Sequence, residues 1–337
     1  MSGPSELRQN ILTKEWVIYS PARKDRPKDV KHREESPVQI QERDPECPFC
    51  PGNEEDLPGI LKERDHPQED HWQTRVVPNK YPALTPEGDN QRFEKGLYLS
   101  MSGYGQHEVL IESYAHNKSM ADMTQEEVRN VVEMYQARYR IQEEDEKNKM
   151  VILFKNQGSK AGTSLRHTHA QLIATGVVPR YVRIRENRAR QYYDDWGRCI
   201  YCDLIQEEED QDLRVITENE RFISIVPYFA KTPYEIWIMP KGHQSSFGKM
   251  KGSERGDFGK MLRDQVKRLH ELFSDLDYNY VIHSSSHDQK SQPYHHWYLQ
   301  IHPRSTLRAG FEIGSGMSIN PSMPEEDAGA LRSLSVE

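Results

Sequence analysis

The chain has 337 residues, of which 35% are hydrophobic and 29% charged, and it carries a net charge of −8. This length accommodates one large or two ordinary globular domains, and the negative charge argues against a surface that neutralises nucleic-acid phosphates. No apolar run approaches the roughly 20 residues that span a bilayer, and the N-terminus lacks the basic and apolar regions of a signal peptide. We therefore expect a cytoplasmic protein that binds neither membranes nor nucleic acid.

All four cysteines fall into two Cys-x-x-Cys pairs, Cys47/Cys50 and Cys199/Cys202. A redox pair usually follows a strand and opens a helix, whose N-terminus lowers the thiol pKa. Neither pair is predicted in that setting; both are expected to form tight turns that hold a metal ion, with redox or buried-thiol roles as alternatives. A tetrahedral zinc site has four ligands, so each pair needs two more.

An internal duplication emerges further along the chain. Apolar strands are predicted at residues 108–111 (EVLI) and 235–238 (EIWI), and each is followed by a histidine eight residues after its glutamate, at His116 and His243. A helix is expected after each. The first begins with a capping box, Thr124 and Glu127, and the second has apolar residues at helical spacing from Phe258 to Phe273.

Each half continues with a strand, at residues 150–154 or 278–282, and closes with a related motif, HTHAQ at 167–171 or HWYLQ at 296–300. The strand histidines are 127 residues apart and the closing motifs 129, whereas the cysteine pairs are 152 apart. The difference predicts an insertion of about 25 residues in the first half, which we place at residues 65–90.

The duplication supplies two histidines for each cysteine pair. We predict two metal sites per chain, with these ligands: Cys47, Cys50, His116 and His167 in one, and Cys199, Cys202, His243 and His296 in the other. A histidine at a strand end is ordinarily just a polar residue. The order Cys, Cys, His, His at matched positions twice over favours metal binding.

His169 shares one face of its strand with His167 and Gln171, because side chains two apart point the same way. If His167 binds metal, His169 stays free to react. The preceding segment, residues 156–164 (NQGSKAGTS), is rich in small and hydroxyl side chains that suit a phosphate. The second half has Tyr298 in place of His169, and a phenol is a poor nucleophile at neutral pH, so only the first half is predicted to be catalytic.

Several long motifs in order resemble the galactose-1-phosphate uridylyltransferase family of the histidine-triad superfamily: WVIYSPARKDRP, CPFCPGNE, RVVPNKYPAL, FKNQGSKAGTSLRHTHAQ, EIWIMPKGH and GFEIGSGMSINP. The resemblance implies an α+β fold made of two histidine-triad halves, residues 1–176 and 177–337, with two antiparallel sheets and packed helices related by pseudo-two-fold symmetry. It also implies zinc at both metal sites and a possible homodimer.

The activity implied is ping-pong nucleotidyl transfer: His169 attacks the α-phosphorus of a nucleotide sugar and releases a hexose 1-phosphate, and a second phosphate-bearing acceptor takes the nucleotidyl group. Gln171 would donate a hydrogen bond to a phosphate oxygen. The other implied substrate-binding residues are Arg23, Arg26, Asn79, Asn156, Gly162, Thr163, Ser164, Glu312 and Asn320.

The leading hypothesis is UDP-glucose:hexose-1-phosphate uridylyltransferase. FKNQGSKAG and GFEIGSGMSINP look more like the ADP-glucose phosphorylase branch, which transfers AMP to inorganic phosphate, and this is the alternative. A non-catalytic, zinc-stabilised nucleotide-binding protein is the alternative of another class. The one basic cluster, with arginines at 180, 183, 185, 188 and 190, is predicted to be a solvated helix face, and residues 324–337 to be a short helix or a frayed tail.

Overall fold

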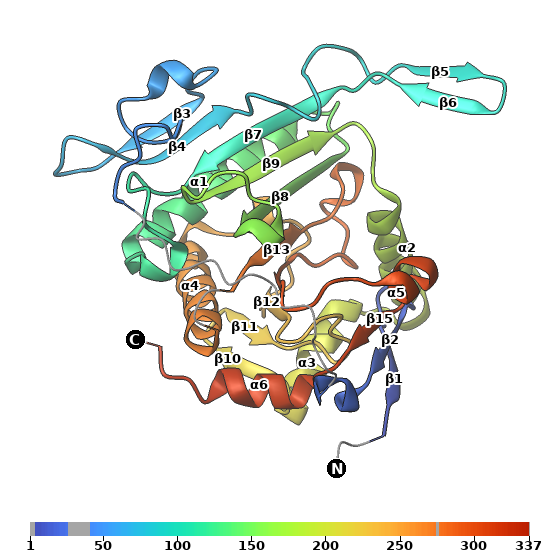
Figure 1. Cartoon of the computed structure of the whole chain (residues 1–337). Coiled ribbons are helices and arrows are strands. Elements are labelled where there is room, and N and C mark those ends of the chain that lie inside the picture. Colours follow the sequence, from blue (N-terminus) through green and yellow to red (C-terminus); the bar gives the residue numbers. More distant parts are fainter. Residues whose placement is uncertain (1–3, 26–40, 274–275, 337) are drawn as a thin grey trace.

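A ten-stranded antiparallel sheet forms the centre of the computed structural model, which describes residues 4–25, 41–273 and 276–336 (Figure 1). Five strands come from the first half: β3 (Lys62–Asp65), β4 (Trp72–Pro78), β7 (Gly105–Ile111), β8 (Met150–Gln157) and β9 (His169–Thr175). Five come from the second half: β10 (Val215–Glu218), β11 (Phe222–Ile225), β12 (Ile236–Pro240), β13 (Tyr278–His283) and β14 (Tyr298–Pro303).

The strand order, β10-β11-β12-β14-β13-β8-β9-β7-β4-β3, is symmetric about the junction of β13 with β8. Each strand on one side of this junction has its counterpart at the same distance on the other, as the duplication predicts. The α+β class is confirmed, and the two expected sheets join edge to edge, with Tyr278 paired to Gln157 and Ile282 to Leu153. The proposed boundary after residue 176 falls between β9 and the next helix.

The insertion lies later than expected. β4 lies within the segment that we placed in the insertion, yet its partner strand in the symmetric order is β11, so β4 belongs to the repeat. What has no counterpart is the hairpin of β5 (Arg92–Lys95) and β6 (Tyr98–Met101), which projects from the body of the molecule (Figure 1).

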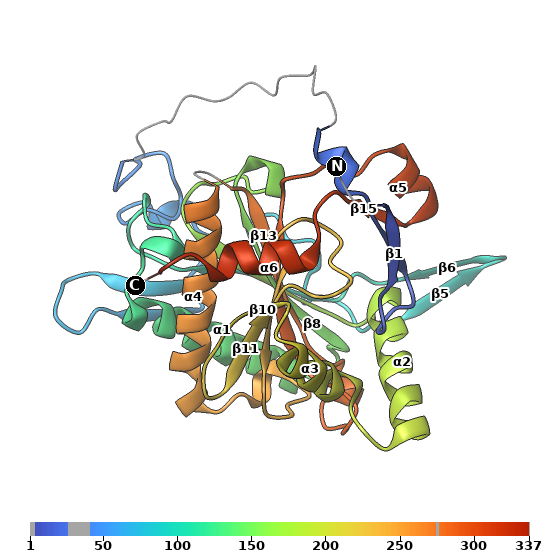
Figure 2. The same ribbon diagram turned by 90° about the horizontal axis from the view of Figure 1, so that it is seen from below.

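Two helices, α1 (Gln125–Glu144) and α4 (Arg255–Leu272), cover one face of the sheet, on the opposite side from α2 (Arg180–Trp196) (Figure 2). The predicted capping box begins α1: Thr124 Oγ1 accepts a hydrogen bond from the Glu127 amide at 3.3 Å. Their apolar sides share one core with alternate strand residues such as Ala170, Leu172 and Leu299. Because strand side chains alternate, His169, Gln171 and Tyr298 point to the other face.

On that other face, α2 (Arg180–Trp196) and α3 (Ile200–Gln211) lie mainly over the second half, and the start of α2 also packs on β8, where Val182 clusters with Met150. Two expectations are wrong here. Arg185 is buried, so α2 is no uniformly solvated arginine face. Cys199 is the residue before α3 and Cys202 lies in its first turn, so this pair does open a helix.

Smaller elements complete the fold. A three-stranded sheet is formed by β1 (Glu6–Gln9), β2 (Trp16–Tyr19) and β15 (Ser318–Asn320). Near it lie α5 (Gly310–Ser315) and α6 (Pro324–Arg332), the latter settling the predicted choice between helix and tail. None of the helices in the described ranges is long and apolar enough to cross a bilayer.

Candidate active site and metal centres

The first four predicted metal ligands converge. Cys50 Sγ lies 3.4 Å from His116 Nδ1 and 3.6 Å from His167 Nδ1, and Cys47 Sγ lies 3.8 Å from His167 Nδ1. A tetrahedral zinc with bonds of about 2.3 Å to sulfur and about 2.05 Å to nitrogen holds these atoms about 3.6 Å apart. The donor set therefore fits zinc.

The remaining ring nitrogen of His167 supports this arrangement. Its Nε2 lies 2.7 Å from the Ser113 carbonyl oxygen, to which it donates, so that Nδ1 carries the lone pair that faces the two sulfurs. All four side chains are buried. A hydrogen bond from a metal-binding imidazole to a backbone carbonyl is the usual way to fix the ring and its tautomer.

The second group repeats the pattern. Cys202 Sγ lies 3.4 Å from His243 Nδ1 and 3.6 Å from His296 Nδ1, and His296 Nε2 donates to the Pro240 carbonyl oxygen at 2.8 Å. Cys199 completes the four. Here His243 is exposed, so the second centre lies nearer the surface than the first.

Metal analysis of the purified chain is expected to find about two zinc ions. Cys199→Ser removes a ligand from the second centre, so its melting temperature falls while the folded fraction still reacts at His169. The matched change in the first centre, Cys50→Ser, lowers both quantities, because His167 is two residues from His169. Differential scanning calorimetry and labelling of His169 measure the two effects. Active protein without bound metal would contradict the ligand assignment.

His169 begins β9 with one ring nitrogen engaged. Its Nδ1 lies 2.8 Å from the His167 carbonyl oxygen, which can only accept, so Nδ1 carries the proton and Nε2 the lone pair. Burial, with 6% of the residue exposed, lowers the pKa of His169 and keeps the ring neutral. Phe49, between the two cysteines of the first pair, packs edge-on against this ring with centroids 5.3 Å apart. The cysteine turn therefore also orients the candidate nucleophile.

His107, which no sequence motif singles out, sets the orientation of the Gln171 amide. The Ala83 amide donates to His107 Nδ1 at 3.1 Å, so His107 Nε2 carries the proton and donates to Gln171 Oε1 at 2.8 Å. Burial lowers the pKa of His107, which favours this neutral form. Asn79 Nδ2 also approaches Gln171 Oε1, at 3.4 Å. With Oε1 engaged, the Gln171 NH₂ group is left to donate to a ligand.

His107→Phe keeps the ring but removes this donor, so Gln171 loses its fixed orientation. We expect kcat to fall about 10- to 100-fold with little change in KM, because the lost contact matters for charge that develops in the transition state. Adding His107→Phe to Gln171→Leu should cost almost nothing further. Steady-state kinetics of the two single variants and the double variant test this, and additive losses would show that His107 does not act through Gln171.

The predicted phosphate loop adjoins His169 but is partly self-bonded. Phe154 pairs with Gln171 and Lys155 with Ala170, a register that carries Asn156 toward His169. Gly158 has a positive φ of 86°, and a Cβ there would collide with the Asp277 carboxylate. The amides of residues 160–163 donate to Asp277 or within the loop. Within the described ranges, neither the amide nor the hydroxyl of Ser164 has a hydrogen-bond partner, so both are donors available to a ligand.

The other side chains of this loop have defined positions. Asn156 Oδ1 accepts from Asn279 Nδ2 at 2.7 Å, Gly162 has a φ of 88°, and Thr163 Oγ1 donates to the Leu165 carbonyl oxygen at 3.1 Å. Asn156 and Thr163 thus have hydrogen-bond partners within the protein, and these bonds fix the conformation of the loop.

The remaining predicted substrate residues are not brought to His169 within the chain. Glu312 caps α5, accepting from the Ala309 and Ile319 amides, and Asn320 is buried with Nδ2 donating to the Ala230 carbonyl oxygen at 3.1 Å. Arg23 is exposed in the 3₁₀ helix Pro21–Asp25, and Arg26 lies outside the described residues. α5 and β15 lie across the molecule from the start of β9 (Figure 1).

In the second half, the position equivalent to His169 is Tyr298, and a side chain from α2 packs against it. Tyr298 stacks on Trp237, with ring centroids 4.2 Å apart, and its hydroxyl accepts from Arg185 Nη1 at 3.1 Å. Arg185 belongs to α2, and among the described residues no helix takes the equivalent place over the first half.

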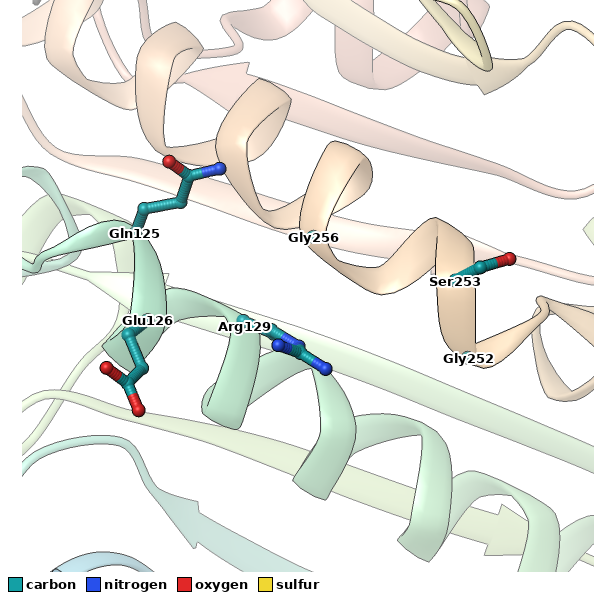
Figure 3. Close-up of a pocket in the computed structure, with 6 residues that line it drawn as sticks. All are labelled: Gln125, Glu126, Arg129, Gly252, Ser253 and Gly256. Atoms are coloured by element: carbon teal, nitrogen blue, oxygen red, sulfur yellow. The ribbon is translucent and has the colours of Figure 1, made fainter.

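Two other features lie apart from this chemistry. A hollow of about 690 Å³ opens near the first turns of α1 and α4, lined by Gln125, Glu126, Arg129, Gly252, Ser253 and Gly256, none of which is a predicted site residue (Figure 3). His66, Glu69 and His71 also cluster: His66 Nδ1 accepts from two backbone amides, and the two ring nitrogens of His71 lie against the Trp72 carbonyl oxygen and Glu69. These contacts account for the cluster without a metal ion.

Comparison with known proteins assigns the class. Residues 2–179 match the N-terminal domain of galactose-1-phosphate uridyl transferase and residues 185–336 match its C-terminal domain. The chain therefore belongs to the galactose-1-phosphate uridyl transferase family, as its motifs predict, and it is a nucleotidyltransferase.

Particular relatives cover nearly the whole chain. ADP-glucose phosphorylase of Arabidopsis thaliana is 35% identical over 98% of this chain and 93% of that protein. Galactose-1-phosphate uridylyltransferase of Thermotoga maritima is 29% identical over 98% of this chain and 99% of its own. The crystal structure of the Arabidopsis thaliana ADP-glucose phosphorylase with bound ADP-glucose superposes with a TM-score of 0.85 and 32% identity, covering 99% of this chain and 100% of that one.

Proposed function

We propose that this chain transfers a nucleotidyl group from a nucleotide sugar to a phosphate-bearing acceptor through a covalent intermediate on His169. The observation that carries the proposal is the state of the His169 ring: Nδ1 donates to the His167 carbonyl oxygen, and Nε2 keeps a lone pair in a neutral imidazole. A neutral imidazole with one fixed nitrogen is a nucleophile that needs no separate base.

The two half-reactions follow from this geometry. His169 Nε2 forms a bond to the α-phosphorus while the bond from that phosphorus to the bridging oxygen breaks, and the sugar leaves as its 1-phosphate. An oxygen of the acceptor phosphate then attacks the same phosphorus, and the electron pair returns to Nε2. Gln171 donates to a non-bridging oxygen, and Ser164 adds donors from the loop, which stabilises charge on the phosphoryl group.

ADP-glucose with inorganic phosphate is the substrate pair that we now place first. The leading hypothesis from the sequence was UDP-glucose with a hexose 1-phosphate, although two motifs look more like the ADP-glucose phosphorylase branch. The relative named ADP-glucose phosphorylase is 35% identical, against 29% for the uridylyltransferase cited above. The uridylyl activity stays the second candidate, because that relative also spans 98% of the chain.

Intact-protein mass spectrometry decides between them. The chain is incubated separately with ADP-glucose and with UDP-glucose, and the expected result is an AMP adduct from the first. A UMP adduct alone would select the second candidate. An adduct from neither, in protein that is folded and contains zinc, would reject the covalent mechanism and leave the non-catalytic alternative.

We infer that zinc occupies both Cys₂His₂ groups as a structural ion. Closed sets of four protein ligands leave no open position for substrate, which is typical of structural and not of catalytic zinc. At the first centre the ion would hold the cysteine turn, and with it Phe49, against the strand that carries His169.

We also infer a homodimer in which the segment around α5 reaches the partner's site. Within one chain α5 and β15, which carry Glu312 and Asn320, lie across the molecule from the start of β9, whereas α5 exposes Phe311 and Ile313 (Figure 1). Mixing inactive His169→Asn protein with protein inactivated by Phe311→Ala should restore activity if the two sites are built from two chains. Sedimentation equilibrium gives the oligomeric state independently.

A further inference from the structure

A small cavity lies beneath α2, beside the second-half residue that replaces the catalytic histidine. It provides about 20 Å³ for the centres of water-sized atoms, and its polar wall includes Arg185, His283, Ser285, His295 and Tyr298. This volume holds one or two such atoms, because a single water needs about 10–15 Å³ by the same measure. It is too small for a nucleotide.

Three of these side chains bring hydrogen-bonding atoms that lack protein partners. Ser285 and His295 are 5% and 4% exposed, and Ser285 Oγ and His295 Nε2 are buried without a hydrogen bond. Arg185 is 6% exposed, and only its Nη1 is engaged, donating to His283 Nδ1 at 2.7 Å and to the Tyr298 hydroxyl at 3.1 Å. Leaving such groups unpaired in a core costs about 1–3 kcal/mol each, more for a charged one.

The charge of Arg185 has no direct counter-ion. Among the described residues no carboxylate forms an ion pair with it. Glu235 balances it only at a distance, through a chain in which Glu235 Oε1 accepts from Gln300 Nε2, Gln300 Oε1 from His283 Nε2, and His283 Nδ1 from Arg185, each at 2.7 Å. Glu186 also lines the cavity, where its Oε1 accepts from the Ser286 amide at 2.8 Å. The wall therefore presents a guanidinium, a hydroxyl and an imidazole beside one carboxylate that already has a backbone donor.

The internal duplication relates this cavity to a segment of the first half. Phe154 pairs with Gln171 as Val281 pairs with Gln300, so Ser284 corresponds to Gln157, the last residue of β8, and Ser285 corresponds to Gly158, which follows it. The cavity thus corresponds to the phosphate loop of the first half. This one step of the argument rests on the proposed function, whereas the donor set and the charge do not.

We propose that this cavity is an anion site that holds one chloride-sized inorganic anion between the Arg185 guanidinium, the Ser285 hydroxyl and the His295 ring. The second half has kept an anion pocket, lost the nucleophile and closed the pocket with α2. A bound anion neutralises Arg185 locally and ties α2 to the β13 end of the sheet.

Two measurements on the full chain test the site. Crystals soaked in sodium bromide should show an anomalous peak in the cavity. Replacing sodium gluconate by sodium chloride at equal ionic strength should raise the melting temperature of the wild type by about 2–4 °C. Ser285→Ala and Arg185→Met should lose this rise, and Arg180→Met, an exposed arginine on the same helix, should keep it.

A cavity that contains only water in the bromide crystals would overturn the proposal, as would a chloride effect of the same size in Ser285→Ala. If Arg185→Met does not fold, Ser285→Ala decides alone, because it removes one hydroxyl and no charge. Nucleotide labelling at His169 is read separately, so failure of the proposed function and failure of the anion site are distinguishable.

Discussion

Replacing His169 by asparagine is expected to abolish formation of the nucleotidyl adduct and to lower turnover by at least about 10⁴-fold. Asparagine retains an amide donor that can reach the His167 carbonyl oxygen, so the start of β9 is disturbed little. What disappears is the Nε2 lone pair, and no described side chain stands ready to replace it. Intact mass after incubation with the nucleotide sugar, together with steady-state rates, measures the effect.

The matched control is Tyr298→Phe, the same strand position in the second half. It removes one hydroxyl and should still form the adduct at His169, since α2 covers Tyr298. Adduct formation by His169→Asn protein at the wild-type level would place the nucleophile elsewhere. Loss of the adduct in both variants would mean that the second half takes part in the chemistry.

Lys155→Met is expected to lower the free energy of unfolding by about 3–5 kcal/mol at pH 7. Lys155 and Glu112 form a fully buried ion pair, and Lys155 Nζ also donates to Thr168 Oγ1 at 2.7 Å and to the His169 carbonyl oxygen at 3.4 Å. Burial alone would raise the pKa of Glu112, but the Lys155 charge and the hydrogen bonds from Lys155, Thr168 and Tyr135 together outweigh burial, and the pKa is lowered. Without Lys155 a carboxylate is left buried and unpaired, which accounts for the loss.

The sign of the pH dependence follows from the same pair. In Lys155→Met the pKa of Glu112 rises above its unfolded value of about 4.3, so the folded variant binds a proton that the unfolded chain releases. The variant therefore loses most stability at neutral pH and regains part of it as the pH falls toward that value. Urea unfolding at pH 7 and pH 5 measures both.

Two further variants isolate the charge. Lys155→Met combined with Glu112→Gln should be more stable at pH 7 than Lys155→Met alone, because no charge remains buried. Lys149→Met, which breaks an exposed ion pair with Asp288 at 3.5 Å, should cost less than about 1 kcal/mol. A Lys155→Met loss no larger than that of Lys149→Met would show that the buried pair does not stabilise the fold.

The metal centres illustrate how far the sequence reaches. The eight ligand candidates come from a repeat of Cys, Cys, His, His, and the structure brings both sets together with sulfur-to-nitrogen separations of 3.4–3.8 Å. Such a repeat can be recognised in the sequence alone because both copies keep the same residue types at similar spacing. The prediction that the second cysteine pair lies in a turn away from a helix start was wrong, since Cys199 immediately precedes α3. Whether a short segment becomes helical depends on what packs against it, which its own sequence does not show.

His107, Lys155 and Arg185 show the opposite case. His107 has no motif of its own, and its role depends on the Ala83 amide that sets its tautomer. Lys155 stands in an ordinary strand pattern, yet it meets Glu112 from another strand in the core. Arg185 looked like one of five solvated arginines until the helix was placed against the sheet. Each depends on a neighbour far away in the chain.

By itself, the sequence determined the duplication, the metal-ligand sets, the family and the histidine that carries no metal duty, because these follow from residue types at repeated spacings. Only the tertiary structure decided which nitrogen of His169 is free, how Gln171 is turned, and why the second half is closed. Hydrogen-bond direction, burial and the path of α2 across the sheet are properties of contacts between distant segments, and no local pattern encodes them. The acidic, four-cysteine chain is thus a symmetric sheet in which α2 and α3 pack mainly over the half that lacks the reactive histidine.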